Sequence, residues 1–249
     1  MAWNRQGESV RILVFQHIAI EHPGTFRDFL AADGVSWDAV ELDAGAPIPP
    51  LDGYDALWVM GGPMDVWEED RHPWLGPEKA AIREAVARRM PFLGVCLGHQ
   101  LLADALGGRV APGAAPEIGI LEIALTPEGV RDPLFAGLAP VAKCLQWHAA
   151  EVVAPPAGAV TLAASPACAV QAFRVGDKAY GIQYHVEVTP DTVPEWGALP
   201  AYQRALEKTL GAGALAGLEA EAARHLPELN RAARRLYDNF MALVRAPAG

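Results

Sequence analysis

Short apolar runs alternate with stretches of helical periodicity through the first half of this chain. The alternating segments, read as strand, helix, strand, strand and helix, cover residues 12–19, 26–32, 39–42, 56–60 and 78–90. Such alternation is typical of a sheet whose strands are parallel and whose two faces are covered by helices. We therefore expect an α/β fold with a mostly parallel central sheet flanked by helices.

The second half of the chain is expected to be richer in β structure and to end in helices. Its predicted strands, separated by Pro, Gly and Asp turns, cover residues 118–125, 141–147, 159–164, 169–175 and 179–184. From about residue 190 to 246 the pattern is helical, and its last part carries one apolar stripe. We expect this segment to pack on the sheet, so that residues 1–249 form a single domain.

The charge balance argues against nucleic acid as a partner. The chain has 20 Lys and Arg against 30 Asp and Glu, a net charge of −10, which repels phosphate backbones unless a basic stripe overrides it. The nearest candidate, Arg231 with Arg234 and Arg235, is interpreted as the solvated face of a helix beside Asp238.

A membrane partner is not expected either, because the sequence contains no apolar run of about 18 residues. The N-terminal residues lack the succession of basic, apolar and small-residue regions of a secretion signal. The three cysteines are an odd number without a CxxC pair, which argues against a disulfide framework or a structural zinc site. We expect a cytoplasmic protein.

Residues 94–98 read Gly-Val-Cys-Leu-Gly, between an apolar strand and a helix, which is the setting of a nucleophile elbow. Glycines on both sides let the backbone turn sharply while the apex side chain projects outwards. The start of the following helix favours an anion there, so Cys96 is the candidate nucleophile. Cys144 and Cys168 lack this bracket and are predicted to be inert core residues.

A thiol that attacks an amide needs a proton acceptor that later protonates the leaving amine, a task suited to histidine. We choose His185, which follows a predicted strand, with Glu187 two residues later on the same face to orient it. The remaining histidines show no recognised metal-ligand spacing with Asp, Glu or Cys, so no catalytic metal and no cofactor are predicted.

Residues 91–103, Pro-Phe-Leu-Gly-Val-Cys-Leu-Gly-His-Gln-Leu-Leu-Ala, closely resemble the nucleophile motif of class I glutamine amidotransferases. The resemblance is to free-standing members similar to the amidotransferase domain of GMP synthase. Further similar segments follow in the family's order at residues 60–66, 117–119, 125–126, 146–148 and 183–187. The resemblance spans most of residues 11–190 and implies a flavodoxin-like class I amidotransferase architecture.

The resemblance also implies roles for individual backbone and side-chain groups. The amides of Gly62 and Leu97 would form the oxyanion hole, with Gly61 allowing close approach of the backbone to the substrate. Gln100, one helical turn after Cys96, would contact the substrate.

A predicted loop at Trp147, His148 and Ala149 would bind the α-amino and carboxylate groups of the substrate through its backbone. The chain departs from the family at two places. Val186 stands where proline is common, and Trp147 stands where biosynthetic members often have a small polar residue.

The expected function is hydrolysis of a γ-glutamyl amide through a thioester on Cys96, releasing ammonia or an amine. The small-molecule substrate would be glutamine or a similar amide, and because no synthase domain follows, the ammonia would pass to a separate synthase or acceptor subunit unless hydrolysis is itself the reaction. One alternative is a γ-glutamyl peptidase or hydrolase that acts on γ-glutamyl peptides or amines, which the bulk of Trp147 favours. Another is a non-catalytic binding or regulatory module of the same fold.

Overall fold

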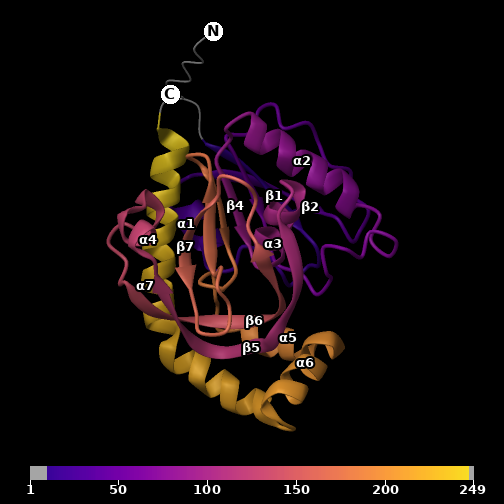
Figure 1. The fold of residues 1–249 in the computed structure, drawn as a ribbon, viewed down its shortest axis with the longest axis vertical. Helices are drawn as coiled ribbons and strands as arrows, with labels where there is room; N and C mark the ends of the chain where they lie inside the picture. Colours follow the sequence, from indigo (N-terminus) through magenta and orange to yellow (C-terminus); the bar gives the residue numbers. More distant parts are fainter. Residues whose placement is uncertain (1–9, 247–249) are drawn as a thin grey trace.

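The computed structural model describes residues 10–246 and shows a nine-stranded sheet with helices on both faces (Figure 1). Residues 1–9, which include most of the segment inspected for a secretion signal, lie outside the described part, as do residues 247–249. Within residues 10–246, no helix combines the length and the apolar character needed to cross a bilayer.

One half of the sheet is parallel and the other half is antiparallel. In spatial order the strands are β2 (Ser36–Glu41), β1 (Arg11–Gln16), β3 (Ala56–Val59), β4 (Phe92–Val95), β9 (Ala179–Ile182), β8 (Ala172–Val175), β7 (Val160–Ala164), β5 (Arg109–Leu125) and β6 (Val141–Ala154). The pairs from β2 to β9 are parallel, and those from β9 to β6 are antiparallel. The predicted α/β class with a parallel core is confirmed, and the second half is the β-rich part, as expected.

Helices cover the two faces of the parallel strands because residues along each strand alternate between those faces. Ile12 and Val14 of β1 pack with α1 (Phe26–Ala32) and the second half of α7 (Ala214–Arg245). Leu13 and Phe15 pack on the opposite face with α2 (Leu75–Ala87) and α3 (Leu97–Ala105). Figure 1 shows α7 running along one side of the sheet and α2 on the other.

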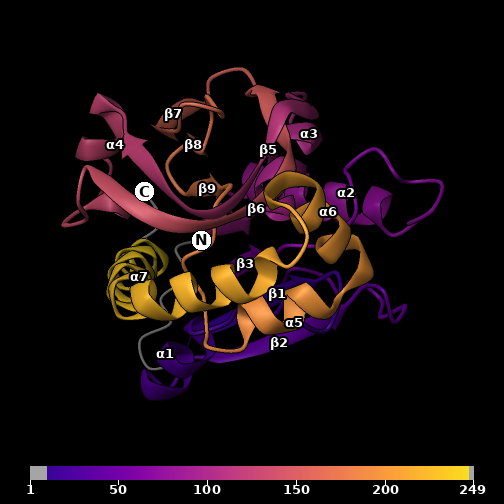
Figure 2. The same cartoon turned by 90° about the horizontal axis from the view of Figure 1, so that it is seen from below.

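The remaining helices complete the antiparallel half. Two short ones, α4 (Pro127–Arg131) and a 3-10 turn (Pro133–Phe135), follow β5. A separate apolar cluster joins α5 (Thr192–Ala198), α6 (Pro200–Leu210) and the first half of α7 to the long pair β5 and β6. Figure 2 shows α5, α6 and α7 together beside this pair. The C-terminal helical segment therefore packs on the sheet, as expected.

Two boundaries differ from the prediction. Helix α2 begins at Leu75, two residues before the proline that was expected to open it. Strand β6 continues to Ala154, so Trp147, His148 and Ala149 lie in a strand and the loop expected there is wrong. The cause is pairing with β5, which matches Trp147 to Ile118 and extends the ladder beyond what local sequence shows.

Candidate active site

Cys96 stands at a sharp turn between β4 and α3. Its φ of 52° and ψ of −103° are unusual for a residue with a side chain, and such strain costs about 1–3 kcal/mol. A Cβ on Gly94 would lie 2.4 Å from the Gly98 carbonyl oxygen, and one on Gly98 would lie 2.0 Å from that of Val59. Only glycine fits at both places, so the strand-turn-helix geometry expected of a nucleophile elbow is present.

The imidazole of His185 lies between the sulfur of Cys96 and the carboxylate of Glu187. Glu187 Oε1 is 2.6 Å from His185 Nδ1, while its Oε2 accepts a hydrogen bond of 2.9 Å from the Val186 N–H. The backbone of His185 is fixed by two hydrogen bonds with Leu145 of β6. The structure thus brings together the three predicted catalytic side chains.

Burial lowers the pKa of His185, but the negative charges of Glu187 and Cys96 and their hydrogen bonds outweigh it. The net result is a pKa well above the ordinary value of histidine. The indole of Trp196, edge-on at a ring separation of 4.6 Å, closes another side of the imidazole. The arrangement favours a thiolate next to an imidazolium, the charge state that attacks a carbonyl carbon.

Gly62 and Leu97 border the same pocket as Cys96, as the oxyanion-hole prediction requires. Within residues 10–246, neither of their N–H groups donates a hydrogen bond. A Cβ on Gly62 would lie 2.7 Å from the sulfur of Met64 and 2.9 Å from Cβ of His17. The pocket therefore contains two free N–H groups near the sulfur, held by a backbone that admits only glycine at position 62.

This pocket is open to solvent, with an empty volume of about 690 Å³. Its walls include four residues predicted to bind substrate: Gln100, Trp147, His148 and Ala149. Gly61, the fifth, is not a lining residue, and a Cβ there would meet Glu21 Oε2 at 2.4 Å and His185 Cε1 at 3.4 Å.

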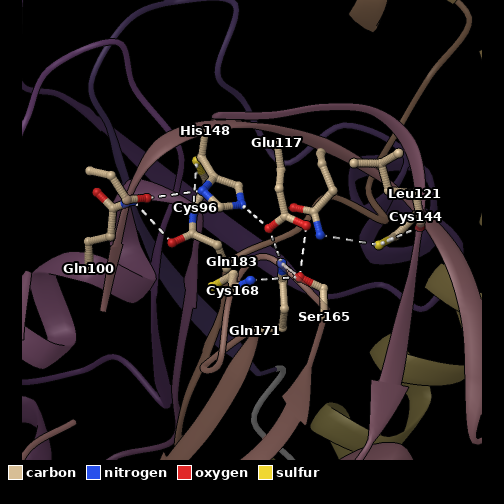
Figure 3. A network of polar contacts seen from close by, with 12 residues as sticks. Cys96, Gln100, Glu117, Leu121, Cys144, His148, Ser165, Cys168, Gln171 and Gln183 are labelled. Atoms are coloured by element: carbon tan, nitrogen blue, oxygen red, sulfur yellow. Dashed lines mark hydrogen bonds and ion pairs between the residues drawn. The ribbon is translucent and has the colours of Figure 1, made fainter. Parts of the chain in front are cut away.

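A chain of amide side chains leads from the sulfur to the pocket wall (Figure 3). Gln183 Nε2 lies 3.7 Å from Cys96 Sγ, and Gln183 Oε1 accepts a 3.1 Å hydrogen bond from Gln100 Nε2. The same Gln100 nitrogen donates to the Ala150 carbonyl at 3.0 Å. Gln100 is therefore held by protein groups on its nitrogen side.

The side chain of His148 belongs to a buried polar network (Figure 3). Its Nδ1 lies 3.0 Å from the Ala150 carbonyl oxygen, and its Nε2 lies 3.2 Å from Glu117 Oε2. Glu117 also accepts 2.7 Å hydrogen bonds from Ser165 and Gln171. Burial raises the pKa of Glu117, but the bonds from His148 and Ser165 outweigh it and lower the pKa overall. His148 is thereby fixed as part of the pocket wall.

Comparison with known proteins agrees with this geometry. The family model described as glutamine amidotransferase class-I matches residues 28–195.

This chain belongs to that family.

One of its relatives, from the glutamine-hydrolyzing GMP synthase of Halobacterium salinarum and named as a subunit of that enzyme, is 43% identical over 158 residues, which cover 63% of this chain and 77% of that protein. The glutamine amidotransferase-like protein YfeJ of Salmonella typhimurium is 33% identical over 190 residues, covering 74% and 78%. A crystal structure of a glutamine amidotransferase from Thermotoga maritima superposes with a TM-score of 0.85 at 30% identity, covering 96% of this chain and all of that one.

Sequence reasoning missed a buried pair beside the imidazole of this class I amidotransferase. The hydroxyl of Tyr202 on α6 donates a short hydrogen bond to Glu21 Oε1, and both residues are almost fully buried. Burial raises the pKa of Glu21 and that of Tyr202. Glu21 follows β1, and its position past the carboxyl end of a parallel strand was the available signal, since ligand sites of such sheets lie there.

The other cysteines and the elbow histidine have no place in the pocket wall. His99 is fully buried against Phe173, and burial lowers its pKa to about 3. Burial raises the pKa of Cys144 well above its ordinary range and that of Cys168 to about 12. In the part of the chain that the structure describes, no three His, Cys, Asp or Glu residues are grouped to hold a metal ion.

Proposed function

We propose that this class I amidotransferase is an enzyme that cleaves a γ-glutamyl amide through a thioester on Cys96. The observation that carries the proposal is the strained elbow, with Cys96 at a φ of 52° beside His185, whose other ring nitrogen is 2.6 Å from Glu187. A backbone conformation of this kind persists only where the surrounding structure enforces it, and such strain is concentrated at functional sites.

In the acylation step, the Cys96 thiolate attacks the γ-carbonyl carbon and forms a C–S bond, while the carbonyl electron pair moves onto oxygen. The N–H groups of Gly62 and Leu97 stabilise that oxyanion. When the tetrahedral intermediate collapses, the C–N bond breaks and the His185 imidazolium gives its proton to the departing nitrogen. Ammonia or an amine leaves, and a γ-glutamyl thioester remains.

In the deacylation step, neutral His185 accepts a proton from water, whose oxygen attacks the thioester carbonyl carbon. A second oxyanion forms in the same hole and collapses by breaking the C–S bond, which releases glutamate and restores the thiolate. Glu187 keeps the Nδ1 proton in place and stabilises the imidazolium.

Substrate recognition is assigned to Gln100 and to the backbone of strand β6 at Trp147, His148 and Ala149, with Gly61 allowing close approach of the loop. A strand edge suits this task because its outward N–H and C=O groups match the amino and carboxylate groups of an amino acid. Trp147, packed 5.8 Å from the rings of Trp196 and Tyr202, fixes the width of that end. Since Tyr202 and Ala201 line the pocket, we place the helices after residue 190 in the same catalytic domain.

Glutamine is the first candidate donor. A γ-glutamyl peptide or amine is the second, and a further hollow favours it. This hollow, of about 1150 Å³, adjoins the catalytic pocket and shares Pro63, Met64 and Asp65 with it. Its wall contains Arg71 and Arg204 beside acidic residues, so it offers contacts to a charged leaving group that ammonia does not need.

The two candidates differ in the partner that they require. Relatives named as one subunit of GMP synthase support a separate synthase subunit that accepts ammonia, whereas a peptidase needs none. Three free cysteines support a reducing compartment such as the cytoplasm.

The test measures release of glutamate from glutamine and from several γ-glutamyl peptides and amines by the wild type and by Cys96→Ala. We expect turnover by the wild type alone, and a glutamyl adduct on Cys96 in rapidly quenched peptide digests. Equal turnover by both proteins would overturn the thioester mechanism and favour a non-catalytic module. Exclusive use of glutamine would exclude the peptidase.

A further inference from the structure

His17 is a fully buried histidine beneath the loop that carries the oxyanion donor. It follows β1 directly, and its Nδ1 lies 2.7 Å from the Gly61 carbonyl oxygen. Its Nε2 lies 3.0 Å from Glu78 Oε1 on α2, and Glu78 is also fully buried. The ring of Trp74 packs against the imidazole at 5.5 Å. His17 is thus held on both nitrogens by groups outside the predicted catalytic set.

Both of these partners accept hydrogen bonds, which defines the protons on His17. A carbonyl oxygen and a carboxylate have no proton to give, so each ring nitrogen carries its own. Burial lowers the pKa of His17, but the charge and hydrogen bond of Glu78 and the bond to Gly61 outweigh it, and the pKa is raised overall. An imidazolium paired with a carboxylate therefore lies under the loop.

The contact with Gly61 also determines where the next amide points. The Gly61 carbonyl and the Gly62 N–H belong to one planar peptide unit, and in a trans peptide they point in opposite directions. No cis peptide bond occurs in residues 10–246. The hydrogen bond that directs the carbonyl toward His17 therefore directs the Gly62 N–H away from it, and Gly62 borders the pocket that contains Cys96.

We propose that His17 and Glu78 are positioning residues of the oxyanion hole, which orient the Gly61–Gly62 peptide so that its N–H faces the developing oxyanion. The inference rests on the proposed function, since it concerns the same acyl transfer. The positive charge at the carbonyl end also polarises the peptide and makes its N–H a stronger donor. Neither residue touches the substrate.

Three substitutions separate orientation from charge. His17→Leu removes the donor to Gly61. His17→Asn keeps it, because the amide nitrogen of Asn takes the place of Nδ1, but it loses the contact with Glu78. Glu78→Gln keeps a polar partner at Nε2 and removes the charge. His225→Gln, at a partly exposed histidine on α7, is the matched control.

We expect His17→Leu to lower kcat for a γ-glutamyl amide about 10- to 100-fold, with KM changed less than about threefold, because a misplaced donor weakens transition-state binding. His17→Asn should recover most of that loss, and Glu78→Gln should fall between Asn and Leu. The control should match the wild type.

Alkylation of Cys96 by iodoacetamide shows whether the effect arises from the oxyanion hole. This reaction displaces iodide at a saturated carbon and builds no oxyanion, so its rate should be unchanged in all variants. A parallel loss of alkylation would mean that the elbow itself is disturbed and would overturn the inference, as would unchanged kcat in His17→Leu. A wild type that cleaves no γ-glutamyl amide overturns the proposed function, and with it this role, whereas an active wild type with an equally active His17→Leu variant overturns this role alone.

Discussion

Replacement of Glu187 by glutamine tests the orientation of the catalytic imidazole with little change in shape. In the native site one carboxylate oxygen lies 2.6 Å from His185 Nδ1, and the other accepts the Val186 N–H at 2.9 Å. An N–H donor must face an oxygen, so Val186 holds the amide oxygen of Gln on its side. The amide nitrogen is then directed at Nδ1, which must give up its proton to accept from it.

The size of the effect follows from this reversal. Loss of a hydrogen bond to a charged partner costs about 1.5–3 kcal/mol, or about 10- to 150-fold in rate. The changed tautomer adds to this, because the proton then sits on Nε2, which must accept one from water; the equivalent change in a serine protease triad costs about 10⁴-fold. We expect Glu187→Gln to lower kcat between about 10²- and 10⁴-fold, as steady-state release of glutamate would measure.

The same substitution has a pH signature in stability. Because the folded-state pKa of His185 is raised, its stabilisation is fully present below the unfolded value of about 6.5 and is lost as pH rises through the raised pKa. The loss of unfolding free energy in Glu187→Gln, measured by urea titration, should therefore be larger at pH 6 than at strongly alkaline pH.

Glu228 provides a matched control, since it forms an exposed pair with His225 at 3.8 Å. Glu228→Gln should change neither kcat nor stability measurably, because exposed pairs contribute little. Activity of Glu187→Gln within about threefold of the wild type, in a properly folded protein, would refute the reasoning about the tautomer.

Three further substitutions test other features of the site. Gly98→Ala should lower the free energy of unfolding by at least about 2 kcal/mol in urea, because its Cβ would lie 2.0 Å from the Val59 carbonyl oxygen, whereas Gly76→Ala, with open space around it, should not; equal stability would contradict the elbow packing. Burial raises the pKa of Glu21, so the folded state loses stability as pH rises from the unfolded value of about 4.3 through the raised one, and Glu21→Gln should show a smaller loss over that interval in the same titration. Trp147→Ala should change the ratio of kcat/KM for glutamine and a γ-glutamyl peptide about tenfold or more, and an unchanged ratio would remove Trp147 from substrate selection.

The elbow was predictable from sequence because its cause is local. Two glycines that bracket a cysteine between a strand and a helix state the backbone requirement directly, and the contacts of Gly94 and Gly98 show the same requirement in space. The His185–Glu187 contact was predictable for a similar reason, since it joins residues two apart in extended backbone.

The buried neighbours of the triad were not predictable in this way. Tyr202 meets Glu21 across 181 residues of sequence, and such contacts depend on how α6 packs on the rest of the fold. The strand conformation of Trp147 likewise depends on its partner Ile118, because β structure is stabilised by cross-strand neighbours. His17 carried a partial signal in its place after a parallel strand, but its hydrogen bonds to Gly61 and Glu78 could not be inferred from spacing.

The family match ends at residue 195, whereas the pocket wall continues with Ala201, Tyr202 and Ala205 of α6. The machinery that makes and breaks the thioester thus comes from the shared part of the chain, and one face of the chamber above it comes from an appended helix. Such a division lets substrate choice diversify by exchange of a short cassette around α6 while the reaction centre stays intact. A chimera that carries the α6 cassette of a relative would inherit the relative's preference for the amide and keep its own chemistry.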